Sequence, residues 1–342
     1  MDQINRQVLL KRRPSGLPVR ADFEIVDAPI PDPGDGQVLL RGLYLSLDPY
    51  MRGRISGVRS YARPVEIGEV IEGRVVGCVA RSRHPDFREG DYAFGGYGWQ
   101  LYSVIDGHAL TRLDAAEAPI STALGVLGMP GLTAYVGLSD IGQPKAGETV
   151  VVSAASGAVG AVAGQLAMAK GARVVGIVGG AEKCRYVEQE LGFDAAIDHR
   201  TPDLGAALDA ACPNGIDVYF ENVGGAVQQA VFPRLNDFGR MVMCGMISEY
   251  NDREPRPGPN LGAVVRKRLR IQGFIVGDQR QRIAEYRAMA APLLRDGRLK
   301  YREDIVEGLD HAPEAFIGLL QGKNFGKLLV KLGDDPSRRN GS

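Results

Sequence analysis

The sequence lacks the features that mark disulfide-rich, membrane-spanning or nucleic-acid-binding proteins. Its cysteines, Cys78, Cys184, Cys212 and Cys244, are scattered, which argues against a disulfide scaffold and is typical of a reducing compartment. No apolar run approaches the roughly 18 residues of a membrane span, and residues 1–3 (MDQ) do not begin a signal peptide. The 41 Lys and Arg balance 41 Asp and Glu, so no global field attracts nucleic acid or an anionic membrane. We therefore expect a cytoplasmic protein with neither kind of partner.

Metal ligands are also scarce. Zinc dehydrogenases of similar size need Cys, His and acidic ligands in their first domain, but Cys78 is the only cysteine before Cys184. The histidines, His84, His108, His199 and His311, lack ligand spacing. We expect no metal. Without a Lewis acid to polarise an alcohol, the sequence favours chemistry in which a conjugated carbonyl accepts electrons.

Glycine is the one excess, with 45 residues of 342, about 13% where about 7% is usual. There is no Gly-Xaa-Yaa period, which excludes collagen. The length predicts about two domains, and the 44% of hydrophobic residues is ordinary for globular proteins. The glycines must therefore serve turns and close backbone contacts.

The first part of the chain has the pattern of short strands separated by turns. Strands are expected at 37–42, 68–77 and 91–100, each bounded by Gly, Pro or Asp. Strands of this length and spacing predict a small barrel-like β unit rather than a parallel sheet.

The pattern changes near residue 126. Apolar strands, with helices between most of them, are expected at 149–153, 173–178, 195–198, 216–220, 240–244 and 271–276. This alternation predicts a doubly wound parallel sheet. A final strand at 326–332 is expected to return to the first domain. The predicted domains are 1–125 with 300–342, and 126–299.

The turn after the first parallel strand matches a dinucleotide-binding fingerprint. It runs Ala155-Ser156-Gly157-Ala158-Val159-Gly160, with Gly164 four residues on, and alanine replaces the first glycine. Gly157 would let a pyrophosphate approach the backbone, while Gly160 and Gly164 would let the helix pack against the sheet. The alternative is a purely structural turn.

The end of the second parallel strand favours NADPH over NADH. NAD-binding proteins place an acid there, but residues 177–180 are IVGG, and Lys183 follows on the next helix. Lys183 can pair with a 2′-phosphate, although it could equally be a solvated surface lysine. Asn222, in the strand-end segment 220–225 (FENVGG), is either a cofactor contact or an Asn in a glycine turn.

Five segments carry a family resemblance. They are 45–53 (LSLDPYMRG), 128–135 (GMPGLTAY), 220–225 (FENVGG), 244–251 (CGMISEYN) and 322–327 (GKNFGK). Together they resemble the zinc-independent medium-chain dehydrogenases/reductases, in the branch of NADPH-dependent alkenal/one and prostaglandin reductases and curcumin-reductase-like enzymes. The resemblance runs from about Val8 to Leu332. It implies an α/β fold with a Rossmann-type domain and a GroES-like, β-barrel-type catalytic domain.

The resemblance also implies roles for individual residues. Lys183 would hold the 2′-phosphate, Tyr50 would face the substrate, and Tyr250 would lie by the nicotinamide ribose and the substrate carbonyl. Where relatives often carry a tyrosine beside the phosphate, this chain has His199 followed by Arg200. The full set of expected cofactor contacts is Met129, Thr133, Ala155, Gly157, Ala158, Val159, Gly160, Gly179, Lys183, His199, Asn222, Cys244, Tyr250, Phe274, Val276 and Asn324. For Met129 and Thr133, ordinary helix packing is the alternative.

The expected reaction is NADPH-dependent reduction of the carbon–carbon double bond of α,β-unsaturated ketones or aldehydes. Hydride adds to the β-carbon, and Tyr250 stabilises the negative charge that develops on the carbonyl oxygen, a role the cofactor's ribose hydroxyl could share. The alternatives are an NADPH quinone reductase of the same superfamily and a non-catalytic NADPH-binding sensor. A homodimer is expected, with strand 271–276 pairing edge to edge. The loops 53–64 and 250–259 are expected to shape the pocket, and the basic run 266–270 (RKRLR) is interpreted as a solvated helix face.

Overall fold

The computed structural model describes residues 4–58 and 60–337. Residues 1–3 and 338–342, at the ends of the first predicted domain, and residue 59, within the loop 53–64, lie outside the described residues. The chain divides into two compact units. The first unit comprises Met1–Leu124, Glu303–Asn324 and Leu328–Ser342, and the second unit comprises Gly125–Arg302 and Phe325–Lys327.

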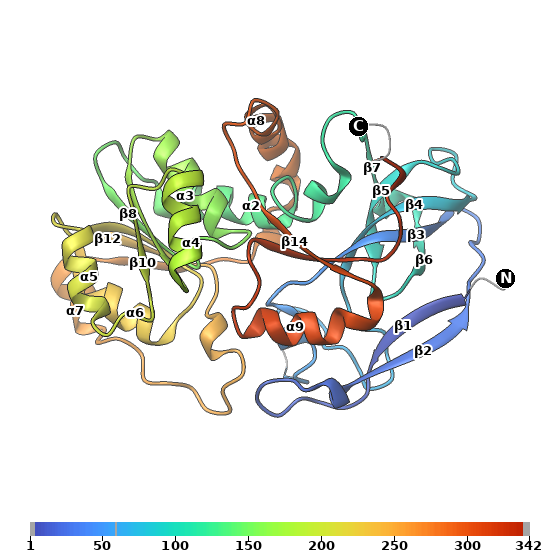
Figure 1. Cartoon of the computed structure of the whole chain (residues 1–342), viewed down its shortest axis with the longest axis horizontal. Helices are drawn as coiled ribbons and strands as arrows, with labels where there is room; N and C mark the ends of the chain where they lie inside the picture. Colours follow the sequence, from blue (N-terminus) through green and yellow to red (C-terminus); the bar gives the residue numbers. More distant parts are fainter. Residues whose placement is uncertain (1–3, 59, 338–342) are drawn as a thin grey trace. The chain divides into compact units, whose positions relative to one another are not determined.

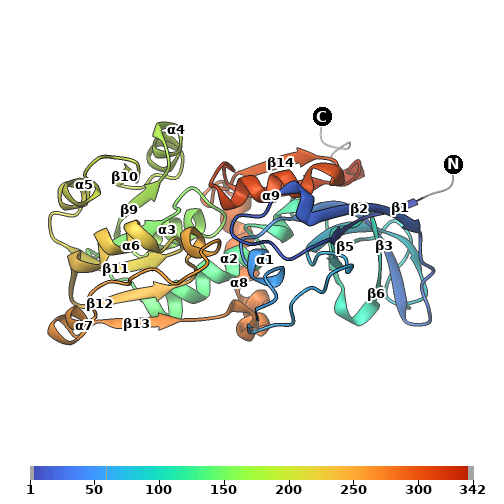
Figure 2. The ribbon, with the colours of Figure 1, turned by 90° about the horizontal axis from the view of Figure 1, so that it is seen from below.

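The second unit is built on a six-stranded sheet. Its strands are β8 (Thr149–Ser153), β9 (Arg173–Val178), β10 (Ala195–Asp198), β11 (Ile216–Glu221), β12 (Leu235–Met243) and β13 (Arg270–Gly273). Every neighbouring pair is parallel, and the order is β10-β9-β8-β11-β12-β13. In chain order this is the Rossmann arrangement, with its switch point between β8 and β11. Figure 2 shows β11, β12 and β13 side by side. The predicted doubly wound sheet is confirmed, although its last strand ends at Gly273 and not at Val276.

Helices connect the strands of this sheet or flank them in the chain, as Figure 1 shows. They are α2 (Met129–Val136), α3 (Gly160–Ala169), α4 (Ala181–Arg185), α5 (Leu204–Ala211), α6 (Gly225–Val231), α7 (Gly262–Lys267) and α8 (Ile283–Arg295). Shorter helical turns are η4 (Gly137–Gly142), η5 (Tyr186–Glu190), η6 (Phe232–Arg234), η7 (Ile247–Glu249) and η8 (Val276–Arg282). The crossovers therefore have the strand–helix alternation expected from the sequence.

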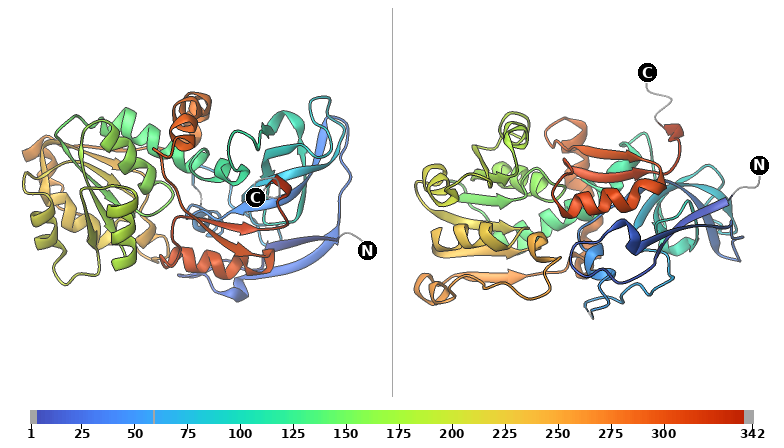
Figure 3. Two further views of the ribbon diagram at one scale, coloured as in Figure 1. Left: turned by 45° about the horizontal axis from the view of Figure 1, so that its top comes forward. Right: turned by 60° about the horizontal axis from the view of Figure 1, so that its bottom comes forward.

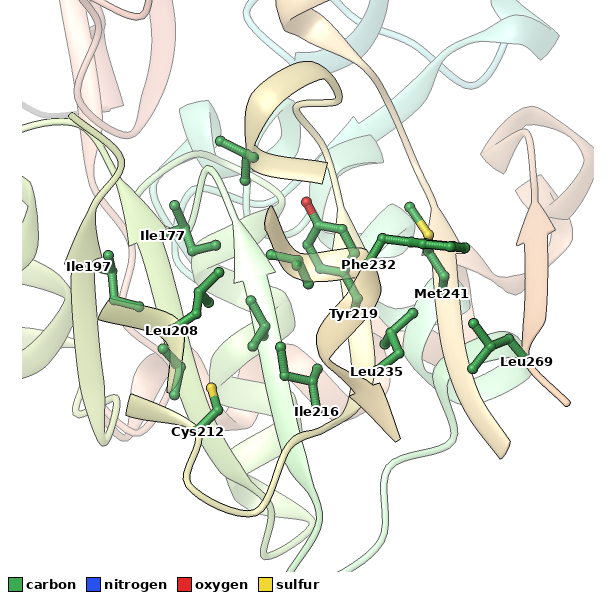
Figure 4. Close-up of a cluster of buried hydrophobic side chains, with 14 of the residues drawn as sticks. Ile177, Ile197, Leu208, Cys212, Ile216, Tyr219, Phe232, Leu235, Met241 and Leu269 are labelled. Carbon is green, nitrogen blue, oxygen red and sulfur yellow. The ribbon is translucent and has the colours of Figure 1, made fainter. Parts of the chain in front are cut away.

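The sheet is buried on both faces because successive residues of each strand point to opposite sides. Tyr219 and Met241 belong to a core formed with residues of α5, α6 and α7, and Figure 4 shows both side chains in this cluster. On the other face, a side-chain carbon on Gly137 of η4 would lie 2.7 Å from the Phe220 ring and 3.0 Å from Val242. Residues 150–152 are all 0% exposed. The continuous apolar runs in the sequence reflect this double coverage.

The first unit is an antiparallel β structure. Its strands are β1 (Ile4–Leu10), β2 (Phe23–Pro29), β3 (Gln37–Ser46), β4 (Arg74–Ser82), β5 (Tyr92–Tyr97), β6 (Tyr102–Asp106), β7 (Thr111–Leu113), β14 (Glu303–Glu307) and β15 (Lys327–Lys331). One sheet has the order β14-β15-β3-β4-β5-β7, with β6 also pairing β3, and β1 and β2 form a separate hairpin. β15 pairs β3 antiparallel, so the predicted return of the last strand is confirmed. The strand expected at 68–77 is misplaced, because β4 begins at Arg74 and Val70 makes only an isolated bridge.

Short helices complete the first unit. They are η1 (Arg20–Asp22), α1 (Met51–Arg54), η2 (Gly107–Ala109), η3 (Ile120–Leu124), η9 (Leu309–His311) and α9 (Ala312–Leu320). The β1–β2 hairpin lies beside η9 and α9 in both views of Figure 3, and Arg6 pairs with Asp310 at 3.0 Å. Trp99, fully buried, stacks on Phe23 and meets Phe316 edge-on. Among residues 4–58 and 60–337, no helix is both long and apolar enough to cross a membrane.

Candidate cofactor and substrate sites

The predicted phosphate turn joins β8 to α3. Ala154 has φ +49°, and its carbonyl accepts the N–H of Gly157 at 2.9 Å, which closes a tight turn directly before the helix. No side chain caps the first N–H groups of α3. Because such N–H groups and the helix dipole attract anions, this end of α3 suits a pyrophosphate.

The glycines of the turn differ in their surroundings. A side-chain carbon on Gly157 would meet only the Ala154 oxygen, at 3.1 Å, whereas one on Gly160 would meet it at 2.4 Å. One on Gly164 would lie 1.8 Å from the Phe193 ring. Gly157 therefore leaves bare backbone open, as a bound pyrophosphate requires, while Gly160 and Gly164 permit close packing. Ala155 is fully buried, and Ala158 and Val159 are half-buried in the same turn.

The side chains of His199 and Arg200 lie against the glycine pair that follows β9. A side-chain carbon on Gly179 would lie 2.9 Å from His199 Nε2, and one on Gly180 would lie 3.3 Å from Arg200 Nη1. Gly180 itself has φ +96°. His199 was among the expected cofactor contacts, but Arg200, which lies beside it, was not. These groups could hold a phosphate at the carboxyl end of β9.

A carboxylate also lies at this point. Asp198 ends β10 and is in register with Val178, the last residue of β9. Hydrogen bonds from the backbone N–H groups of Arg200 and Gly180 lower the pKa of this carboxyl, although burial opposes them. No acidic residue directly follows β9 in the sequence, as the prediction of NADPH required. The neighbouring strand β10, however, brings the carboxylate of Asp198 to the same place. The Asp198 carboxylate accepts hydrogen bonds from the backbone of the turn, and His199 and Arg200 lie near it.

Lys183 is part of a cluster of cations and aromatic rings. Its Nζ lies 5.9 Å from the centre of the Phe325 ring, and the guanidinium of Arg302 lies 3.8 Å from the same centre. Tyr186 meets Phe325 edge-on at 5.0 Å, and burial raises the pKa of Tyr186 to about 12. Cation–π contacts of this kind orient long side chains. Phe325 and Arg302 were not anticipated, since they lie more than a hundred residues from Lys183 in the chain.

Asn222 is fixed where β11 ends, beside the switch point. Its backbone N–H donates to Ser153 Oγ and its side-chain Nδ2 to Ser153 O, both at 2.8 Å. Ser153 Oγ in turn donates to Glu221 Oε1 at 2.8 Å, and the N–H of Val223 donates to the same oxygen at 2.6 Å. This network ties the ends of β8 and β11 together and sets the direction of the Asn222 side chain. Ser153 and Glu221 were missed in the sequence.

The loop after β12 brings Tyr250 to the same edge of the sheet. The phenol oxygen accepts a hydrogen bond from the N–H of Met246 at 3.3 Å, and a side-chain carbon on Gly245 would lie 3.0 Å from it. The N–H of Ile247 donates to Asn222 O at 3.2 Å, so the loops that carry Tyr250 and Asn222 are joined. The phenol is thus held by the backbone at the edge of the sheet where β11 and β12 end.

Cys244 is the first residue after β12. Its N–H donates to Glu221 O at 3.0 Å. Burial, with a smaller effect of Glu221, raises the pKa of its thiol to about 12. The thiol therefore stays protonated near neutrality, and the cofactor contact expected for Cys244 stays a prediction.

The remaining expected cofactor residues are less distinctive. Thr133 is buried, and its hydroxyl donates to Met129 O at 2.7 Å within α2, which matches the helix-packing alternative. Phe274 and Val276 are half-buried and follow the end of β13. Asn324, also half-buried, precedes Phe325 and groups with the first unit.

The residue expected to face the substrate, Tyr50, lies in the first unit. It directly precedes α1, and burial raises the pKa of its phenol well above the usual value. The guanidinium of Arg54 lies 5.6 Å from the centre of its ring. The phenol is therefore neutral at physiological pH.

Two further predictions concern charge and metal. The basic run is exposed in part, but Lys267 Nζ donates to the carbonyls of Pro233 and Leu235, and Arg268 pairs with Asp237. Part of the basic run therefore makes hydrogen bonds and an ion pair within the second unit, whereas a fully solvated helix face would make none. In the described part of the chain, no three His, Cys, Asp or Glu side chains cluster as metal ligands would.

Comparison with known proteins identifies the family of this chain. A family profile described as the N-terminal domain of oxidoreductase matches residues 6–113, and one described as zinc-binding dehydrogenase matches residues 158–294. The NADPH-dependent curcumin reductase of Escherichia coli (strain K12) is 50% identical over 97% of this chain and 99% of its own. The chain belongs to the zinc-independent medium-chain dehydrogenases/reductases. The family predicted from the five segments is confirmed.

Other members of this family show the same extent of similarity. The NADP(+)-dependent 2-alkenal reductase of Nicotiana tabacum is 41% identical over 95% of this chain and 97% of its own. Among solved structures, CurA from Vibrio vulnificus in complex with NADPH is 48% identical, with a TM-score of 0.92 over 96% of this chain and 100% of that one. The family likeness therefore spans both units.

Proposed function

We propose that this protein is an NADPH-dependent reductase of the carbon–carbon double bond of α,β-unsaturated ketones and aldehydes. One observation carries the proposal: a tyrosine hydroxyl, that of Tyr250, is held by a backbone N–H at the sheet edge that also carries the phosphate turn. The names of the curcumin and 2-alkenal reductases support the reaction class, and the NADPH-bound relative supports the cofactor.

The residues of the second unit fit NADPH. The open backbone at Gly157 and the uncapped start of α3 would hold the pyrophosphate. Arg200, His199 and Lys183 would hold the 2′-phosphate, and Asn222 would contact the nicotinamide half. Bound NADPH supplies the hydride that adds to the β-carbon of the enone.

The protein's own contribution to the chemistry lies at the carbonyl oxygen. As the β-carbon accepts hydride, negative charge develops on that oxygen. The Tyr250 O–H donates a hydrogen bond to it, and a preorganised donor of this type is worth roughly 3–4 kcal/mol. Tyr50 contacts the substrate, and solvent supplies the proton to the α-carbon.

A panel of substrates tests the reaction class. Purified protein with NADPH is mixed separately with enones, quinones and saturated ketones, and oxidation of the cofactor is followed. Turnover of enones but not of saturated ketones is expected. Turnover of quinones alone would favour the quinone reductase instead, and no turnover at all would favour a non-catalytic NADPH sensor.

A tyrosine variant tests the mechanism separately from the reaction class. Tyr250→Phe removes the hydroxyl, and with it both the proposed donor and the acceptor of the Met246 N–H, and we expect kcat/KM for an enone to fall about 100-fold. Tyr135→Phe is the matched control, since its hydroxyl bonds to the exposed carboxylate of Glu285 in the same unit. An unchanged kcat/KM for Tyr250→Phe would move the donor role to the ribose hydroxyl of the cofactor.

A further inference from the structure

Arg54 is a buried cation held by a short network in the first unit. It ends α1 and is 7% exposed. Its Nε donates to Glu72 Oε1 at 3.2 Å, and the Tyr97 hydroxyl donates to Glu72 Oε2 at 3.3 Å. Both oxygens of Glu72 are therefore occupied, and the carboxylate fixes the guanidinium in place.

Two tyrosine rings flank the same guanidinium. Its central carbon lies 4.6 Å from the centre of the Tyr61 ring and 5.6 Å from that of Tyr50. Tyr61 is 58% exposed, whereas Tyr50 is half-buried. Arginine favours such positions over aromatic rings. The cation thus links an exposed ring to the ring proposed to contact substrate.

The outer N–H groups of Arg54 have no partner within residues 4–58 and 60–337. Only Nε makes a hydrogen bond there, although a guanidinium offers five donors. Neither outer nitrogen is among the enclosed side-chain atoms of the described residues that lack a partner, so both keep accessible surface through which an acceptor on a ligand can reach them.

The charges around Tyr50 cancel. The groups that act on its phenol are Asp48 and Glu72, which are negative, and Arg74 and Arg54, which are positive. Arg54 is directly neutralised by Glu72. An oxygen acceptor such as an ether, ester or ketone would gain hydrogen bonds from Arg54, but a carboxylate would gain little attraction and would meet Glu72.

We propose that Arg54 and Glu72, between the rings of Tyr50 and Tyr61, form a charge-neutral subsite that selects uncharged, aryl-conjugated enones over enones carrying a carboxylate. The flat rings favour a flat substituent, and the paired charges favour a neutral acceptor on it. The inference rests on the proposed enone reductase function, and it makes Arg54 and Glu72 specificity-determining residues of that reaction.

Three probes of equal conjugation test the subsite. They are 4-phenylbut-3-en-2-one, its para-carboxylate and the methyl ester of that acid. We expect the wild-type kcat/KM for the ester to exceed that for the acid by at least about tenfold. Arg54→Lys keeps the charge but loses the planar donors, and kcat/KM for the ester should fall about tenfold.

Removing the neutralising charge is the decisive change. Glu72→Gln leaves Arg54 positive, so the ester-to-acid ratio should fall about tenfold, and added salt should reverse the gain for the acid. Glu66→Gln is the matched control, because it makes the same charge change at the Arg13–Glu66 pair, whose carboxylate is exposed. That variant should leave the ratio unchanged.

The outcomes separate this inference from the function on which it rests. If the parent enone is reduced but Glu72→Gln leaves the ester-to-acid ratio as in wild type, the subsite is refuted and the reductase stands. Equal turnover of acid and ester by the wild type would also refute it. Failure to reduce any of the three probes would contradict the function and the subsite together.

Discussion

At the scale of single residues, we propose that side chains at the carboxyl edge of the parallel sheet decide which dinucleotide fits. His199 and Arg200 come from the end of β10, yet their side chains lie against Gly179 and Gly180 at the end of β9. Glycine at these positions leaves room for the side chains of His199 and Arg200, which a larger residue would fill. We therefore propose that cofactor preference is set by the residues that follow β9 and β10 and by Lys183 on α4.

Arg200→Ala should weaken NADPH binding selectively. Losing a charge-assisted hydrogen bond to phosphate costs about 1.5–3 kcal/mol, so KM for NADPH should rise roughly tenfold or more, while KM for NADH should hardly change. Initial rates with each cofactor at saturating enone measure this. Arg185→Ala, which removes an exposed cation from α4, is the control. Equal effects of Arg200→Ala on both cofactors would exclude a 2′-phosphate contact.

The Cys244 thiol should make stability fall at alkaline pH. Its pKa is raised to about 12 in the folded protein by burial, from a usual value near 9. Above about pH 9 the unfolded thiol loses its proton while the folded one keeps it, so unfolding becomes more favourable as pH rises towards 12. The free energies of unfolding of wild type and Cys244→Ser, measured by urea denaturation, should therefore converge by about 1–2 kcal/mol between about pH 8 and about pH 10.5. A constant difference would contradict the protonated thiol.

At the scale of elements, the β8–α3 junction was the most predictable part of the chain. A buried β-branched strand, a glycine turn and an alanine-rich helix agree with one another locally, so the strand at 149–153 matches β8. The predicted start of β4 is wrong because residues 68–73 alternate like a strand but form only an isolated bridge with β1, at Val70, together with single backbone hydrogen bonds such as that from Ile71 N–H to Val8 O. Asp198, Arg302 and Phe325 could not be assigned to the site from the sequence, because strand register and tertiary packing bring them there.

The packing of α3 gives a direct test at this scale. In Gly164→Ala the new methyl would lie 1.8 Å from the Phe193 ring, so we expect a loss of about 1–3 kcal/mol in the free energy of unfolding. Urea denaturation measures it. Gly258→Ala, which meets nothing within 4 Å, is the control. Adding Phe193→Leu to Gly164→Ala should recover part of the loss, and strict additivity of the two changes would contradict the contact.

At the scale of the whole molecule, the relevant feature is the edge of the second unit's sheet at β13, which pairs with no further strand of the described residues. β13 ends the strand order, and Ile271 on it is 37% exposed. Nearby in the chain, Leu261 and Val265 are 64% and 80% exposed. Open edges of this kind pair readily with a second copy.

We expect sedimentation velocity to show a homodimer that depends on this edge. Ile271→Pro would remove a backbone donor and stiffen the strand, and should shift the protein towards monomer. Ile4→Pro, at the exposed start of β1, is a comparable change in the first unit and should not. A wild-type monomer at micromolar concentration would overturn the expectation.

The central claim is that hydride adds to the β-carbon of a conjugated carbonyl compound. NADPH deuterated at the transferring position, incubated with the protein and 4-phenylbut-3-en-2-one, tests it directly through the NMR spectrum of the product. The account predicts the saturated ketone with deuterium on the β-carbon and solvent hydrogen on the α-carbon. Deuterium on the carbonyl carbon of an allylic alcohol, or no transfer to the enone at all, would contradict it.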